Sequence, residues 1–104
     1  DDKIQGRLIL SDNHLLTIDN SQRLVGRADL KKYTEKDQNL ISRSHFTVYE
    51  KDLKYFIKDG ITNVQNKASE SNTIVNEEKL LGNEHELKNG DKILVSDVLI
   101  LFEV

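Results

Sequence analysis

The sequence predicts an all-β fold, an antiparallel sandwich or barrel, on three observations. Short apolar or alternating segments recur along the chain, and they are rich in the valine, isoleucine, threonine and tyrosine that strands prefer. Polar turn clusters separate these segments. No window shows a sustained apolar stripe with the period of a helix. Many short strands at this spacing are typical of a sandwich or barrel.

The expected strands follow one another from the amino end to the carboxyl end of the chain. The fifth shows the pattern most clearly, because Leu53, Tyr55 and Ile57 alternate with polar or outward positions and so share one face. In chain order, the expected strands lie within residues 6–10, 14–18, 23–26, 45–49, 53–57, 73–75, 92–95 and 98–104.

Turn signals lie between the expected strands at residues 11–13, 19–21 and 51–52. The clearest hairpin candidate is Asn89-Gly90, flanked by "EL" and "KILV". Two polar stretches are too long for a tight turn. Residues 28–40 are expected to form a loop or one short helical turn, and residues 60–71 to form a long loop of the kind that is often functional or mobile.

Length and composition limit the function classes. A chain of 104 residues with 37% hydrophobic and 32% charged residues is expected to form one globular domain over residues 1–104. The net charge of −3 argues against a nucleic-acid partner, and the longest apolar run is too short to span a membrane. We therefore expect neither a nucleic acid nor a membrane as partner, and no cofactor.

Cysteine and methionine are both absent from the chain. The absence of cysteine excludes a disulfide frame and a thiolate metal site, and it fits a reducing compartment such as the cytoplasm. The absence of methionine, and with it of an initiator, suggests a domain cut from a longer protein.

The stretch "ISRSHFTV", residues 41–48, raises the question of an enzyme. A serine nucleophile needs a base within hydrogen-bond reach and an oxyanion hole. On a regular strand, however, Ser42 and His45 point to opposite faces, and no glycine flanks the serine. A metal site is weaker still, because His14, His45 and His85 match no ligand spacing. We expect neither catalysis nor a bound metal.

An anion-binding site is better supported, by three segments. In "LVGR", residues 24–27, an arginine fork follows a glycine at the end of a strand. "ISRSH", residues 41–45, offers a hydroxyl, a second guanidinium and backbone amides. "SESNTIVN", residues 69–76, offers short polar side chains at a strand entrance. If these segments converge, they form a small phosphate pocket beside a groove for an extended peptide.

The order of four segments, "LVGR", "ISRSH", "SNTIVN" and "LKNGDKILV", resembles that of a forkhead-associated (FHA) domain. The resemblance extends from about residue 15 to the carboxyl end, and the S-x-x-H element after a G-R is its most discriminating part. It implies an antiparallel sandwich of about eleven strands with its binding loops at one end. It also implies a non-enzymatic adaptor that binds phosphothreonine-containing proteins or peptides in kinase and phosphatase signalling.

The resemblance assigns roles to five residues in the first two segments. Arg27 would contact the phosphate, and Ser42 would donate its hydroxyl to a phosphate oxygen. Arg43 would contact the peptide. Gly26 would permit the backbone turn before Arg27, and His45 would hold the loop without touching the ligand.

The third segment departs from the family pattern S-x-N-G-T-x-x-N and can be aligned in two registers. With one residue dropped, Ser71 lies beside the phosphate and Asn72 contacts the peptide; we prefer this register on electrostatic grounds. Without the gap, Glu70 would lie beside the phosphate, Ser71 at the peptide-binding position, and Asn72 at the glycine position, where its tolerance of left-handed backbone would suit it. Thr73 opens the strand in both registers.

A second hypothesis is a phosphate-independent interaction scaffold with the same fold. It is motivated by the altered third segment and by acidic residues near the expected site, namely Glu35, Asp37 and Glu70. The basic residues Arg23, Lys31 and Lys32 are expected to form a solvated face and not to contact the ligand.

Overall fold

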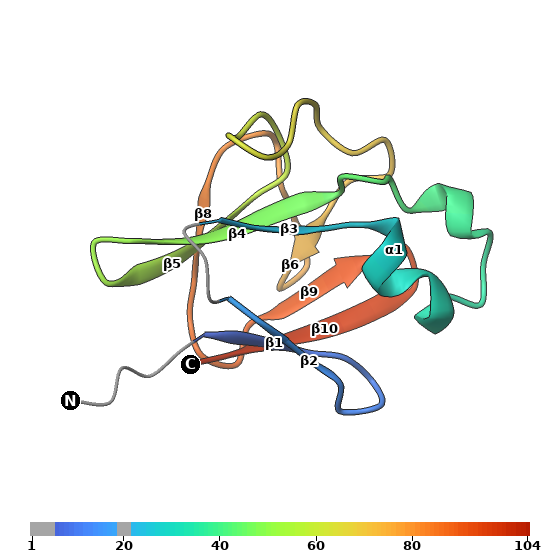
Figure 1. The fold of residues 1–104 in the computed structure, drawn as a ribbon, viewed down its shortest axis with the longest axis horizontal. Helices are drawn as coiled ribbons and strands as arrows, with labels where there is room; N and C mark the ends of the chain where they lie inside the picture. The colour runs from blue at the N-terminus through green and yellow to red at the C-terminus, as the bar shows by residue number, and fades with distance from the viewer. Residues whose placement is uncertain (1–5, 19–21) are drawn as a thin grey trace.

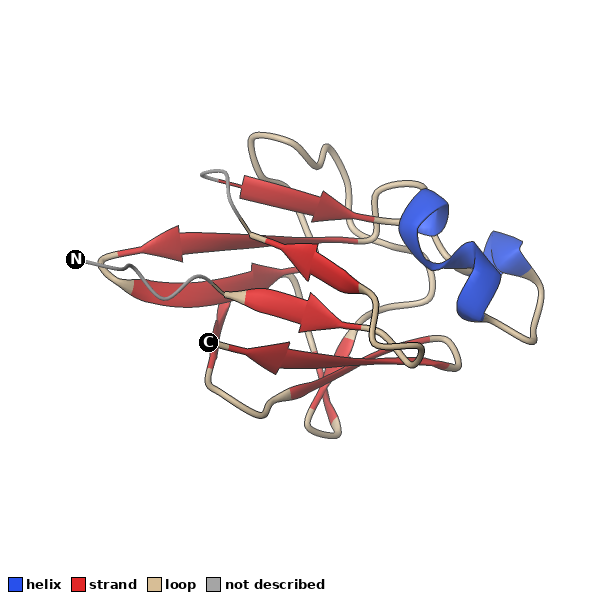
Figure 2. Cartoon of the chain, turned by 60° about the horizontal axis from the view of Figure 1, so that its bottom comes forward, coloured by secondary structure: helices blue, strands red, loops and turns tan. Residues whose placement is uncertain are grey.

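The computed structural model describes residues 6–18 and 22–104. It shows two antiparallel sheets packed into a sandwich, which confirms the all-β prediction (Figures 1 and 2). The six-stranded sheet has the order β2-β1-β10-β9-β6-β7, and the four-stranded sheet has the order β3-β4-β5-β8. The strands are β1 (Arg7–Ile9), β2 (Leu15–Thr17), β3 (Gln22–Val25), β4 (Phe46–Lys51), β5 (Lys54–Lys58), β6 (Ile74–Val75), β7 (Glu78–Lys79), β8 (His85–Leu87), β9 (Lys92–Val95) and β10 (Val98–Glu103).

The core lies between the sheets and follows from the alternation of side chains along each strand. In the six-stranded sheet, Leu8 pairs with Phe102, and both side chains are fully buried. In the four-stranded sheet, Val48 pairs with Ile57, and both are again fully buried. Burial of these apolar side chains, each contributing about 1.5–3 kcal/mol, holds the two layers together.

One detail of the expected fifth strand is wrong. Tyr55 and Ile57 are buried as predicted, but Leu53 is 89% exposed. Asp52 and Leu53 both have positive φ, 55° and 65°, so together they form the tight turn that joins β4 to β5. This pair of left-handed residues matches the twist of an antiparallel hairpin, so Leu53 lies in the turn and not in the strand.

The prediction of a hairpin at Asn89-Gly90 is also wrong, although the chain does turn there. Gly90 has φ of 93°, as a turn glycine should. The strands on either side, however, lie in different sheets: β8 pairs with β5, whereas β9 pairs with β6 and β10. The turn therefore carries the chain from one layer to the other, and local sequence does not distinguish this crossing from a hairpin.

Of the two remaining turn predictions, one is confirmed and the other cannot be compared with the structure. Residues 11–13 form the expected turn, in which Asn13 has φ of 66° and its amide donates to the Leu10 carbonyl at 2.8 Å. The turn expected at residues 19–21 lies outside the described residues.

The polar segment 28–40 contains short helical turns at one end of the sandwich (Figure 2). These are α1 (Arg27–Leu30) and the 3-10 turns η1 (Lys31–Tyr33) and η2 (Gln38–Leu40). No helix in the described part of the chain is both long and apolar enough to cross a membrane. In Figure 1, the end of β3, α1 and the beginning of β4 meet at this end, opposite the carboxyl terminus.

A buried hydrogen bond links the two layers at the opposite end. The amide of Gly6, just before β1, donates to the hydroxyl of Tyr55 on β5 at 2.8 Å. Tyr55 also packs against Phe102 of β10, with ring centroids 5.5 Å apart. The Tyr55 ring therefore packs in the core between the layers, while its hydroxyl accepts a hydrogen bond from the segment before β1.

We predict that Tyr55→Phe lowers the free energy of unfolding by about 2 kcal/mol, because it leaves the buried Gly6 amide without an acceptor. Urea denaturation would measure the change. Tyr49→Phe is the matched control, because the Tyr49 hydroxyl meets Glu84 at the exposed surface. Its effect should stay within about 0.5 kcal/mol. Equal losses in the two variants would contradict the prediction.

Candidate functional site

The three segments singled out in the sequence converge on one cavity. It has a volume of about 610 Å³ and lies at the helical end of the sandwich. Arg27 comes from the start of α1, Ser42 and Arg43 from the loop before β4, and Glu70 from the loop between β5 and β6. The residues that line it are Arg27, Asn39, Ser42, Arg43, Ser44, Asn66, Lys67 and Glu70.

Gly26 brings the first two segments together, but not by the positive φ expected of a turn glycine. Its backbone is extended, with φ of −158° and ψ of −160°. What requires glycine is space, because a Cβ at this position would lie 1.8 Å from the Arg43 carbonyl oxygen. The close approach allows two backbone bonds between the segments: Arg27 N–H to Ser42 O at 3.0 Å, and His45 N–H to Val25 O at 2.9 Å.

Arg27 is held in place through one nitrogen of its side chain. Its Nε donates to the Ile41 carbonyl at 2.8 Å, which holds the side chain across the loop. No described residue bonds to its terminal nitrogens, and the side chain lines the cavity. A guanidinium held in this way presents its terminal N–H groups as a ready pair of donors for an anion.

Ser42 is prepared as a donor by its neighbours. Its Oγ accepts a hydrogen bond from the Glu70 amide at 3.1 Å. The hydroxyl hydrogen is therefore left for another acceptor, since the bond uses only a lone pair of the oxygen. The side chain lines the same cavity as Arg27.

His45 is fully buried and bridges two loops through its ring nitrogens. Its Nδ1 accepts from the Ser42 amide at 3.0 Å. The other nitrogen, Nε2, must then carry the proton, and it donates to the Asn72 carbonyl at 2.8 Å. Burial is the main cause that lowers the pKa of this imidazole below its usual value of 6.5, which keeps the ring neutral.

This geometry does not support a serine hydrolase. Both imidazole nitrogens of His45 bond to backbone groups, so neither is available to take the proton of the Ser42 hydroxyl. The histidine instead joins the amide of Ser42 to the carbonyl of Asn72.

The long loop between β5 and β6 is held from within by Gln65. The side chain is fully buried, and its amide nitrogen donates to the carbonyls of Ser44, His45 and Lys67 at 3.2, 3.1 and 3.0 Å. Its Oε1 accepts from the Thr47 hydroxyl at 3.0 Å. The two N–H groups of the amide are shared among three carbonyls and its oxygen accepts from a hydroxyl, so both ends of this buried amide are engaged within the fold.

Asp59 holds the other half of the same loop. Its buried carboxylate accepts from the Ser69 amide at 2.7 Å, from the Ser69 hydroxyl, and from the Thr73 hydroxyl at 2.8 Å. Thr73 is thus buried and bonded to the same carboxylate that holds Ser69. Donors converging on one carboxylate offset the cost of burying its charge.

The backbone of the third segment fits the ungapped register better than the gapped one. Asn72 has φ of 68°, the left-handed conformation expected at the family's glycine position. Glu70 lines the cavity, whereas Ser71 donates its hydroxyl to the Leu40 carbonyl and does not. Electrostatics favours Ser71 beside the anion, but the hydrogen bonds of Glu70 and Ser71 hold the loop in the other register.

The cavity is positive within an acidic chain. Arg27, Arg43 and Lys67 line it, against one carboxylate, that of Glu70. The other two acidic residues expected near the site, Glu35 and Asp37, do not line the cavity. The Glu35 amide donates to Asp97, and the Asp37 carboxylate accepts from the Asn39 amide at the start of η2. A local positive cluster of this kind favours an anionic ligand.

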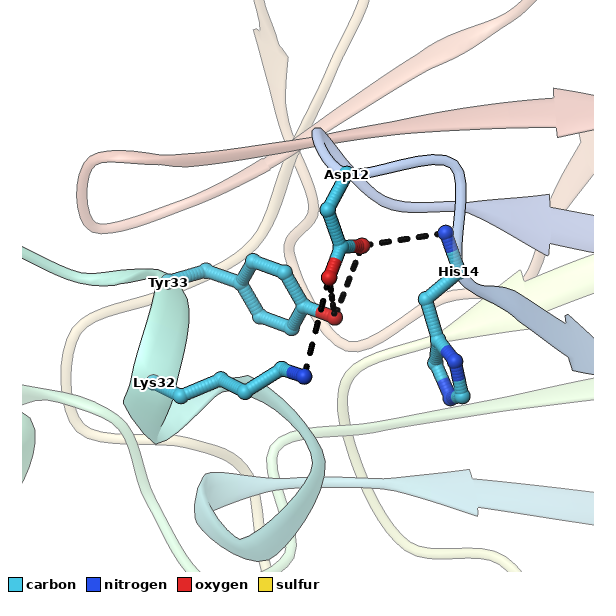
Figure 3. A network of polar contacts seen from close by, with 4 residues as sticks. All are labelled: Asp12, His14, Lys32 and Tyr33. Atoms are coloured by element: carbon cyan, nitrogen blue, oxygen red, sulfur yellow. Dashed lines mark hydrogen bonds and ion pairs between the residues drawn. The ribbon is translucent and has the colours of Figure 1, made fainter.

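A surface network holds the helical segment against the six-stranded sheet (Figure 3). The Tyr33 hydroxyl donates to both carboxylate oxygens of Asp12, at 3.0 and 3.1 Å, and Lys32 Nζ lies 3.6 Å from the same carboxylate. The His14 amide donates to it at 3.0 Å, and this bond is the first cause that lowers the pKa of Asp12. Lys32 therefore pairs within the protein and does not line the cavity.

Several functional residues were not apparent from the sequence. Asn39, Asn66 and Lys67 reach the cavity from segments that carry no motif, and Ser44 reaches it from within "ISRSH", where no role was assigned to it. The supports Asp59 and Gln65 likewise act through contacts that are distant in sequence. Only Asp59, a charged residue directly before a glycine at the end of a strand, offered a signal that could have been read.

The chain is similar to FHA domains in sequence and in structure. The FHA domain family model matches residues 23–96. No curated protein sequence matches the chain. A solved structure from a study of phosphothreonine-dependent FHA domain interactions has a TM-score of 0.70 and 18% identity, with 97% of each chain covered.

Two other solved structures show the same likeness. The FHA domain of human APLF, in complex with an XRCC1 bisphospho peptide, has a TM-score of 0.69 and 19% identity over 96% of this chain and 98% of that one. The FHA domain of the CT664 protein from Chlamydia trachomatis has a TM-score of 0.69 and 17% identity over 97% and 98%. At these identities the likeness concerns the fold.

We predict that Gly26→Ala destabilises the domain by about 3 kcal/mol, because its Cβ meets a backbone oxygen that cannot rotate away. Gly60→Ala is the control, since the nearest atom to its Cβ would be 3.3 Å away. Its cost should stay below about 1 kcal/mol. Thermal unfolding of both variants tests the difference, and a well-tolerated Gly26→Ala would show that the close approach is not required.

We also predict that acid weakens the fold through His45. Because its pKa is lowered on folding, the unfolded chain takes up the proton first as the pH falls. The contribution of His45 is complete above its usual value of 6.5 and is lost progressively below it, until the folded imidazole is also protonated.

Nitrogen-15 NMR of the imidazole would test both parts of this prediction. We expect the proton on Nε2 at neutral pH and a titration midpoint below 6.5. A midpoint at or above that value, or a proton on Nδ1 at neutral pH, would contradict the assigned bridge.

Proposed function

The chain belongs to the FHA domain family, and from this premise we propose that it is a phosphothreonine-dependent adaptor for proteins or peptides. FHA domains are interaction modules. The observation that carries the proposal is the pairing of a fixed guanidinium and a fixed hydroxyl, Arg27 and Ser42, in one positive cavity.

The donors of the cavity suit a phosphate group. A phosphorylated threonine carries close to two negative charges and three acceptor oxygens. Arg27 can engage two oxygens through its terminal nitrogens, and Ser42 can donate its free hydrogen to another. Arg43 and Lys67 add positive charge at the wall, where they can contact the phosphate or the peptide backbone.

The affinity for a phosphopeptide is limited by the conformational entropy that the peptide loses on binding. Hydrogen bonds to charged groups contribute about 1.5–3 kcal/mol each. Two or three of them, less the ordering of a flexible peptide, give affinities on the order of micromolar. Such affinities suit a reversible contact that a kinase creates and a phosphatase removes.

The peptide itself would run past the third segment. With Asn72 in the left-handed position, Ser71 takes the place of the family's peptide-binding asparagine. Its hydroxyl already donates to Leu40, so its oxygen is the group left to accept from a peptide amide. Asn72 lies beside it, and we propose that its side chain contacts the same stretch of peptide.

Glu70 favours a second candidate, a partner bound without phosphate through the same end of the sandwich. A carboxylate at the wall of the cavity disfavours an anion by like-charge repulsion. Treating the partner with phosphatase distinguishes the two candidates, because only the first loses binding.

We predict that Arg27→Ala weakens binding of a phosphothreonine peptide at least about tenfold, since it removes the charged donors of the cavity. Fluorescence anisotropy with matched phosphorylated and unphosphorylated peptides would measure this. Arg7→Ala is the control for net charge, because Arg7 pairs with Glu103 on the six-stranded sheet.

Circular dichroism must show that Arg27→Ala is still folded, because its Nε also braces Ile41. Arg27→Lys serves as a second variant, since it keeps the charge but loses the fork of donors. A folded Arg27→Ala protein that binds the phosphorylated peptide as well as the parent does would refute the proposed function.

A further inference from the structure

We propose that Glu70 makes this site selective for phosphothreonine peptides that carry a lysine or arginine one or two positions from the phosphorylated residue. This inference rests on the proposed function and names the class of ligand that the same site prefers. The Glu70 carboxylate is the one acidic group among the described residues that line the cavity.

Glu70 lies next to the expected phosphate donor. Its amide donates to Ser42 Oγ at 3.1 Å, so the residue is in direct contact with the hydroxyl that would bind the phosphate. It lines the same cavity as Arg27 and Ser42. A phosphate held by these two groups therefore lies beside the Glu70 side chain.

The loop cannot easily carry Glu70 away from this place, because both of its neighbours are anchored. Ser69, before it, is buried and donates its amide and hydroxyl to Asp59. Ser71, after it, donates its hydroxyl to the Leu40 carbonyl. With the backbone held on either side, the Glu70 side chain starts from a fixed point at the wall of the cavity.

No described residue neutralises the Glu70 carboxylate. It forms no ion pair within the described part of the chain, although Lys67 and Arg43 line the same cavity. Since the phosphate would engage the cations that are present, the carboxylate is left for the ligand to neutralise.

A basic residue of the peptide supplies that neutralisation. Residues of an extended peptide are spaced by about 3.3 Å, so a lysine or arginine one or two positions from the phosphothreonine can reach a carboxylate beside the phosphate. The same carboxylate repels an acidic residue at that position of the peptide. Selectivity therefore comes from attraction of basic peptides and from repulsion of acidic ones.

The test is a set of phosphothreonine peptides with lysine, glutamine or glutamate placed in turn at the two positions on either side of the phosphothreonine. Affinities for the parent domain and for Glu70→Gln would be measured by anisotropy. At the position that faces Glu70, we expect lysine to bind about two- to fivefold more tightly than glutamine, the range of an exposed ion pair. Glu70→Gln should abolish this difference.

Glu77→Gln is the matched control, because it removes the same charge from the β6–β7 turn, away from the cavity. It should leave the preference for lysine unchanged. An unphosphorylated lysine peptide shows whether the phosphate is still required.

The outcomes separate this inference from the proposed function. Phosphate-dependent binding with no lysine preference, or an equal gain for every peptide on Glu70→Gln, overturns the selectivity and leaves the proposed function intact. Failure of all phosphorylated peptides to bind the folded parent domain overturns both.

Discussion

The hydrogen bonds of the buried His45 ring are the interaction on which the rest of the site depends. Through Nδ1 the ring holds the amide of Ser42, and through Nε2 it holds the carbonyl of Asn72. One neutral side chain thereby fixes two loops that are distant in sequence. The arrangement needs a particular protonation state, and burial of the ring supplies it by lowering the pKa. What looked in the sequence like half of a catalytic pair is a structural bridge between two loops that line the cavity.

A second constraint is the local concentration of positive charge on a chain whose net charge is −3. The acidic residues Asp12, Asp29 and Asp59 are engaged in hydrogen bonds with their own surroundings. The terminal groups of Arg27 and the side chains of Arg43 and Lys67 have no such partners within the described residues and line the cavity. Among the described residues that line the cavity, Glu70 carries the one carboxylate that opposes them. The excess of positive charge favours an anionic group in the cavity, and the Glu70 carboxylate disfavours further negative charge beside that group.

The fold and half of the site could be predicted from the sequence, because they depend on local patterns. Apolar and alternating segments predicted eight of the ten described strands, but not β7 or β8. The glycine-arginine and S-x-x-H elements marked Arg27, Ser42 and His45, which the structure brings together. The rest depends on contacts between distant segments. The close packing at Gly26, the crossing between sheets at Asn89-Gly90 and the support of the third loop by Gln65 have no local signature. For the same reason the register around Glu70 had to be decided by hydrogen bonds and not by charge.

The most direct test of phosphate recognition at this end of the sandwich is an NMR titration of the labelled domain with a phosphothreonine peptide and its unphosphorylated counterpart. We predict that the phosphorylated peptide shifts the amide signals of Arg27, Ser42, Arg43 and Glu70, the residues around the cavity. The unphosphorylated peptide should leave them in place. Shifts confined to the outer faces of the sheets, or equal shifts with both peptides, would contradict the assignment of this cavity as a phosphate site.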